Sequence, residues 1–164
     1  KIIDLAGPDA TATDYYQMGR TYYTAALSSR ADTSASGKLK FKEIATKADS
    51  AFSKVCQMTP DSYIGYLLRG NLNSALDPTT ALGLAKPHYE ATIEILLKKI
   101  GEGATNGYTK DLLRCYEYLG VYYFQKDDKV NSTKYWTKVL ELDPNNANGK
   151  AILEEYKNPA PAKK

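Results

Sequence analysis

A tyrosine–glycine pattern that occurs three times, about fifty residues apart, constrains the fold of this chain more than any other feature. Each copy has a tyrosine four residues before a glycine. The pairs are Tyr15 with Gly19, Tyr66 with Gly70, and Tyr116 with Gly120. Self-similarity at a fixed period is typical of repeat proteins, in which each unit buries its apolar face against a neighbour. The sequence therefore predicts stacked units.

A second pattern follows each glycine, with a small residue four positions before an aromatic one. The pairs are Ala48 with Phe52, Ala85 with Tyr89, and Ser132 with Trp136. Residues four apart share one face of a helix. In the first and third copies a proline, Pro60 or Pro144, stands eight residues after the aromatic residue. A proline there is typical of a helix that has just ended.

Apolar residues recur at helical spacing around these markers, while alternating strand patterns are missing and the chain has few valines. The pattern predicts seven helices, near 12–29, 38–58, 61–76, 84–100, 109–126, 129–142 and 146–156. The 14 tyrosines suit such a fold, because a tyrosine ring packs well at half-buried positions between helices.

The third copy resembles a tetratricopeptide repeat without any gap. Its signature order, an aromatic residue, Leu-Gly, tyrosine, a small residue, an aromatic residue and proline, is present throughout. The residues are Tyr116, Leu119, Gly120, Tyr123, Ser132, Trp136 and Pro144. The first copy matches with about 17 inserted residues, which lengthen its helices and the loop at 31–37. The second is the weakest, because Arg69 and Asn73 replace an apolar and an aromatic residue.

The resemblance implies an all-α, right-handed α-α superhelix (solenoid) of three helix pairs plus a C-terminal capping helix. The repeat domain is expected over 11–146, with repeats at about 12–61, 62–100 and 109–146. Residues 1–10 are an expected lead-in, as the remnant of an upstream repeat in an excised or processed piece. A capping helix is expected over 147–156 and a disordered tail over 157–164. The segment Gly83–Glu90 is similar in sequence to tetratricopeptide proteins of the Bacteroidetes. Many of those proteins are exported, which favours an exported or periplasmic location.

The repeat signature is expected to pack between helices. A small residue in the first helix of a pair lets the second helix approach, and the aromatic residue of the second fills the gap toward the next unit. The signature residues are Tyr15, Gly19, Ala48, Phe52, Pro60, Tyr66, Gly70, Ala85, Tyr89, Tyr116, Leu119, Gly120, Tyr123, Trp136 and Pro144.

Charge argues against nucleic acid as a partner. The chain has 22 Lys and Arg against 19 Asp and Glu, a formal excess of only +3, whereas nucleic-acid binders present a strongly basic face. Lys38, Lys40, Lys42 and Lys47 form the densest basic stretch, which we interpret as a solvated helix face. No uncharged stretch approaches the roughly 18 apolar residues that a membrane span requires.

Catalytic chemistry has few candidates in this sequence. His88 is the single histidine, so neither a catalytic triad nor a histidine-based zinc site is expected. Cys56 and Cys115 lie in apolar helical runs and are expected to be inert buried thiols, although a disulfide between them stays open. We therefore predict a protein that is not an enzyme and has no cofactor or metal.

The family binds ligands mainly on its concave face, which the first helix of each pair lines. The predicted peptide-binding residues on that face are Tyr16, Arg20, Tyr23, Asn71, Arg114, Glu117 and Phe124. The alternative for Tyr16, Tyr23 and Phe124 is packing of the inner wall. Some members hold a C-terminal carboxylate with a Lys and Asn clamp, but only Arg114 resembles a clamp residue here, so that activity is not expected.

The predicted function is a non-catalytic scaffold that binds an unidentified protein or peptide. The alternative is a structural or oligomerisation segment of a larger multi-repeat protein, with self-association through the first repeat. A concentration-dependent mass would favour the alternative, and a stable monomer would favour a separate partner. Fold-level analogy does not decide between them.

Overall fold

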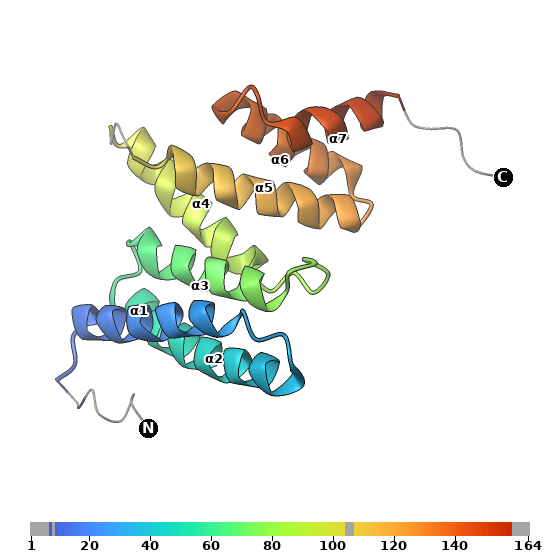
Figure 1. The fold of residues 1–164 in the computed structure, drawn as a ribbon. Coiled ribbons are helices and arrows are strands. Elements are labelled where there is room, and N and C mark those ends of the chain that lie inside the picture. Colours follow the sequence, from blue (N-terminus) through green and yellow to red (C-terminus); the bar gives the residue numbers. More distant parts are fainter. Residues whose placement is uncertain (1–6, 8, 104–106, 159–164) are drawn as a thin grey trace. The chain divides into compact units, whose positions relative to one another are not determined.

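The computed structural model describes residues 7, 9–103 and 107–158. This part of the chain holds seven α-helices and no strands (Figure 1). They are α1 (Ala12–Ser29), α2 (Ala35–Met58), α3 (Tyr63–Leu76), α4 (Lys86–Gly101), α5 (Thr109–Gln125), α6 (Lys129–Leu142) and α7 (Ala147–Lys157). The predicted all-α class is confirmed. Of the predicted lead-in and tail, residues 1–6, 8 and 159–164 lie outside the described residues.

Polar caps fix where the helices begin. Thr11 and Asp14 form a reciprocal capping box at the start of α1. Helix α2 begins at Ala35, three residues before its predicted start, because the Ser34 side chain accepts a 3.1 Å hydrogen bond from the backbone N–H of Gly37. Asp128 caps α6 in the same way by accepting from the backbone N–H of Asn131.

The chain divides into two compact units, Lys1–Pro78 with α1, α2 and α3, and Thr79–Lys164 with α4, α5, α6 and α7. The division falls between α3 and α4, inside the segment 62–100 that the sequence assigns to one repeat. Each unit is described by itself below.

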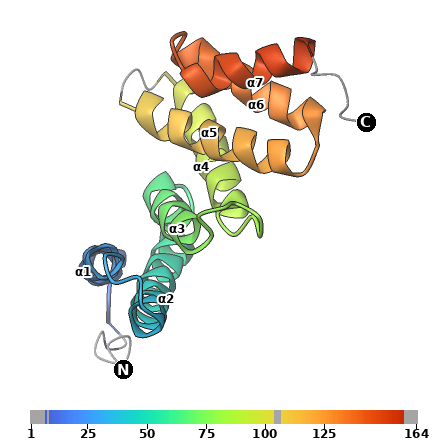
Figure 2. The same ribbon diagram turned by 45° about the vertical axis from the view of Figure 1, so that its right-hand side comes forward.

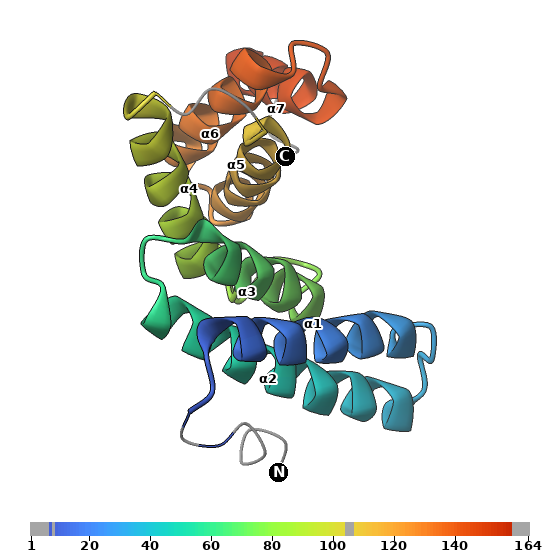
Figure 3. The ribbon, with the colours of Figure 1, turned by 90° about the vertical axis from the view of Figure 1, so that its left-hand side faces the viewer.

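The first unit is built on the close approach of α1 and α2, which lie side by side in Figure 3. A Cβ atom on Gly19 would lie 2.6 Å from Cε1 of Phe52, so only glycine lets α1 pack this closely on that ring. The fully buried centre of the unit is apolar and consists of Ala26, Ala45, Ala48, Phe52 and Leu72. Three of these residues are alanines, which keep the two helix backbones close.

In the second unit, too, a glycine lets two helices approach closely against an aromatic ring. A Cβ atom on Gly120 would lie 2.7 Å from Cε2 of Trp136, which is buried in α6. Ser132 donates a 3.1 Å hydrogen bond from Oγ to the carbonyl oxygen of Gly120 and ties the two helices together. Helix α7 packs on α6, as Figure 2 shows, with Gly149 against the side chain of Leu140.

The residues that depart from the repeat pattern in α3 have a structural partner. Arg69 donates from Nε and Nη2 to the two carboxylate oxygens of Asp49 in α2, each at 3.0 Å. Asn73 donates from Nδ2 to Asp49 Oδ1, also at 3.0 Å. Burial lowers the pKa of Arg69, but the hydrogen bonds and the charge of Asp49, together with Cys56, outweigh it and raise that pKa overall. A polar clamp therefore joins α2 to α3 where the repeat pattern has an apolar and an aromatic residue.

Candidate binding surface

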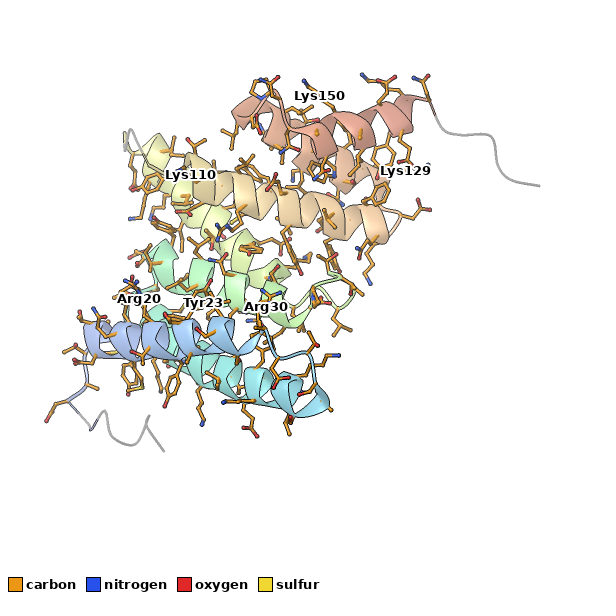
Figure 4. All side chains as sticks on the ribbon, in the orientation of Figure 1. Arg20, Tyr23, Arg30, Lys110, Lys129 and Lys150 are labelled. Atoms are coloured by element: carbon orange, nitrogen blue, oxygen red, sulfur yellow. The ribbon has the colours of Figure 1, made fainter. Side chains whose placement is uncertain are left out.

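The predicted binding residues of α1 form one cluster around the ring of Phe52. The ring centroids of Tyr16 and Tyr23 lie 6.5 Å and 6.4 Å from that of Phe52. Both tyrosines are half-buried and pack against the core of the first unit. Arg20 is exposed between them, with Cζ 5.9 Å from the centroid of the Tyr16 ring. Figure 4 shows Arg20 and Tyr23 on α1. In this cluster Arg20 carries the accessible polar group, and the tyrosines support it.

Helix α3 supplies the remaining predicted residue of the first unit, Asn71, which is half-buried. The charged atoms of α3 belong to Arg69, whose side chain is 22% exposed and engaged by Asp49. The pairing of Arg69 with Asp49 was not predicted from the sequence. The bidentate pair brings together residues twenty positions apart, so a search for local motifs does not find it.

In the second unit the three predicted residues of α5 differ in their surroundings. Arg114 is exposed. Glu117 is half-buried and accepts a 2.8 Å hydrogen bond at Oε1 from Nδ2 of Asn146, the residue that caps α7. Phe124 is 37% exposed, and its ring centroid lies 6.0 Å from that of Tyr156 in α7. Helix α7 therefore covers part of the surface that Glu117 and Phe124 would offer to a ligand.

A row of tyrosines lines the second unit where α4, α5 and α6 meet. The rings of Tyr123 and Tyr135 stack at 5.6 Å with an angle of 7° between their planes, and Tyr116 lies 6.1 Å from Tyr135. Burial raises the pKa of Tyr116 and of Tyr135. Lys86 bonds Glu90 and lies 5.9 Å over the ring of Tyr123. These rings pack helices together rather than offering open aromatic faces.

The thiols are free and buried. Cys56 and Cys115 form no disulfide, and burial raises the pKa of each thiol. Among the described residues, no three His, Cys, Asp or Glu side chains gather as a metal ion would require. None of the helices that these described residues form is long and apolar enough to cross a membrane.

The chain is similar to a solved structure of known type. A solved structure, the C-terminal part of a TPR repeat-containing protein from Cytophaga hutchinsonii, a member of the Bacteroidetes, superposes with a TM-score of 0.66 at 34% sequence identity. The match covers 87% of this chain and 47% of the other, so the chain spans about half the length of that structure. No protein-family model matches the sequence, and no curated protein matches it either. The predicted resemblance is confirmed: the chain has the all-α helical-repeat fold of tetratricopeptide repeat proteins and is similar to one from the Bacteroidetes.

Proposed function

We propose that this chain is a non-catalytic scaffold that binds a protein or peptide, with one candidate surface on α1 and α3 of the first unit and one on α5 of the second. The fold supports a protein-interaction role in general terms, and folds of this type are generally non-catalytic. The observation that carries the finer proposal is the pairing of Arg20 with Tyr16 on the exposed side of α1.

Arg20 and Tyr16 have the properties of an interface anchor. Arginine and tyrosine are enriched among the residues that dominate binding energy. The Tyr16 ring is already held against Phe52, and the guanidinium group of Arg20 is held over that ring. Binding would therefore restrict few additional rotatable bonds, which lowers the entropic cost of association. The planar guanidinium group offers several N–H donors to carbonyl or carboxylate oxygens of a peptide.

Arg114 is the corresponding candidate anchor in the second unit. It is exposed on α5, one helical turn before Glu117. Because Glu117 already bonds Asn146 and Phe124 packs on Tyr156, these two residues would shape the surface, and Arg114 would make the polar contact.

The test compares capture of partners from an extract of the source cell by the wild-type chain and by the variant Arg20→Ala/Arg114→Ala. Tyr16 stays unchanged, because its removal would disturb the packing around Phe52 and confuse binding with folding. A matched control replaces two exposed lysines outside the proposed surface, Lys98→Ala/Lys150→Ala. Mass spectrometry identifies the captured proteins.

We expect a partner that the wild type and the lysine control capture and the arginine variant loses. A partner that all three chains capture equally would refute binding through Arg20 and Arg114. Light scattering of the wild type tests the second candidate. A mass that rises with concentration, together with no captured partner, would replace the scaffold with a self-associating structural segment.

A further inference from the structure

Helix α2 carries the whole positive charge excess of the chain. It contains five lysines and two carboxylates, so its own excess is +3, equal to the formal charge of all 164 residues. One of the two carboxylates, Asp49, is bound to Arg69 of α3. The rest of the chain is balanced in charge as a sum, and α6, with three lysines and one glutamate, is the next most basic helix.

Three of these lysines have no partner in the part of the chain that the structure describes, whereas Lys40 attracts Asp32. No carboxylate there forms an ion pair with Lys38, Lys42 or Lys47. By contrast, Lys86 and Lys138 on other helices pair with glutamates at one-turn spacing. The sequence interpretation of Lys38, Lys40, Lys42 and Lys47 as a solvated helix face agrees with their exposure but does not explain the missing partners.

The lysines also lie at the end of the helix that disfavours them. The N-terminus of a helix carries partial positive charge, so cations near it are destabilising by a few tenths of a kcal/mol each. Lys38 and Lys40 lie close to the start of α2 at Ala35, and its first turn has no acidic residue. Asp32, just before the Ser34 cap, accepts a hydrogen bond from the Ser34 N–H and attracts Lys40, so it offsets part of this cost.

The same face of α2 has a shallow hollow with one apolar side chain, Leu39, in its lining. Among the described residues, five line it, at the i, i+3, i+4, i+7 and i+8 spacing of one helix face: Leu39, Lys42, Glu43, Thr46 and Lys47. Leu39 is 60% exposed although it lies on a helix that buries most of its apolar residues. We define these five residues as the α2 outer face. It points away from the buried Ala45 and Ala48, which pack toward α1.

We propose that the α2 outer face is a second docking surface, which binds an acidic polypeptide segment carrying an apolar side chain. Carboxylates of the segment meet Lys42 and Lys47, its apolar side chain covers Leu39, and Glu43 accepts a hydrogen bond from an N–H of the segment. The surface is separate from Arg20 and Arg114, so the inference does not depend on the proposed function.

The composition of the face favours polypeptide over other anionic partners. A nucleic acid would bring phosphates against Glu43, and the charge-balanced remainder of the chain offers no wider basic field to attract it. A membrane surface would require several apolar side chains to insert, whereas the α2 outer face offers Leu39 alone.

The experiment measures binding of a labelled peptide of glutamates with leucines at one-turn spacing and an amidated C-terminus, by fluorescence anisotropy with the full chain. The test variant is Lys42→Glu/Lys47→Glu. The matched control is Lys98→Glu/Lys150→Glu, which changes the net charge by the same amount on other helices. Leu39→Ser tests the apolar contact without changing charge. Circular dichroism establishes that every variant is folded.

We expect Lys42→Glu/Lys47→Glu to weaken binding by about tenfold or more, the control to bind like the wild type, and added salt to weaken binding. Leu39→Ser is expected to weaken it several-fold. Arg20→Ala/Arg114→Ala is expected to retain binding, which separates this surface from the proposed function.

Four outcomes would overturn the proposal. The first is no binding to the wild type, and the second is equal loss in both lysine variants, which would show an effect of net charge alone. The third is stronger binding of duplex DNA or phosphatidylserine vesicles than of the peptide. The fourth is binding that appears only after residues 1–6 are deleted, which would assign the surface to the chain's own segment.

Discussion

Gly120→Ala tests the argument that close helix approach, rather than backbone freedom, requires glycine in the middle of α5. A Cβ atom at this position would lie 2.7 Å from Cε2 and 2.8 Å from Nε1 of Trp136. These distances are far below the separation of about 3.5–4.0 Å at which carbon atoms attract each other. The indole ring cannot move aside easily, because Trp136 is 1% exposed and its other edge lies against Gly149.

Two opposing terms set the magnitude. Alanine in place of a helical glycine, where nothing clashes, stabilises a protein by roughly 0.5–1 kcal/mol. Forcing one extra methyl group into a packed core destabilises it by about 1–3 kcal/mol. We therefore expect Gly120→Ala to lower the free energy of unfolding by about 1–2 kcal/mol, or the melting temperature by roughly 2–8 °C. Gly101 is the matched control, because a Cβ atom there would meet no atom within 4 Å.

Urea denaturation followed by tryptophan fluorescence measures this change in the second unit, because Trp136 is the single tryptophan of the chain. We expect Gly101→Ala to be neutral or slightly stabilising, and Gly120→Ala to be destabilising. If Gly120→Ala proves as stable as the wild type or more so, the close approach of α5 to the Trp136 ring is not what requires glycine. The packing argument would then fail for Gly19 and Phe52 as well.

Two further predictions concern buried polar groups. Asp49→Ala should lower the free energy of unfolding by about 1–2 kcal/mol, because it leaves the half-buried guanidinium group of Arg69 without its acceptor. The control, Asp61→Ala at an exposed site, should change this free energy little. Urea denaturation followed by circular dichroism measures both variants. Burial raises the pKa of the Cys115 thiol in the folded state, whereas in the unfolded state it is about 8.5. Above that pH only the unfolded state ionises, so this thiol should lower the free energy of unfolding as pH rises. Below that pH it should not change the free energy of unfolding. Consistently, a thiol reagent near pH 8 should label Cys56 and Cys115 only in urea, and rapid labelling of the native chain would contradict the burial of both.

The helices could be predicted from the sequence because their signals are local. Apolar residues at helical spacing, followed by Pro60 or Pro144, define the helix ends within a few residues. Helix α2 begins three residues before its predicted start, because the sequence offers several serines and a glycine before Lys38 as possible caps. The hydrogen bond from the N–H of Gly37 to Ser34 selects one of them as the cap.

The candidate binding residues were harder to predict than the helices. Their position on the first helix of each pair specifies a helix face, but the length of a side chain decides what it contacts. Tyr16 and Tyr23 are long enough to turn back from that face onto Phe52, so they became half-buried supports. Arg20 lies on the same face of α1 but stays exposed, because its charged group must remain in water.

The polar residues of α3 and the lysines of α2 differ in whether other residues of the chain already bind them. This difference indicates where a partner is more easily bound. Arg69 and Asn73 depart from the repeat pattern in the sequence, and both bond Asp49, so their polar groups serve the junction of α2 and α3. The lysines of α2 look like an ordinary solvated face, yet Lys42 and Lys47 pair with no described carboxylate. A polar group that the fold has already satisfied has little left to offer a partner. Recognition is therefore better sought at Lys42 and Lys47 than at the more unusual residues of α3.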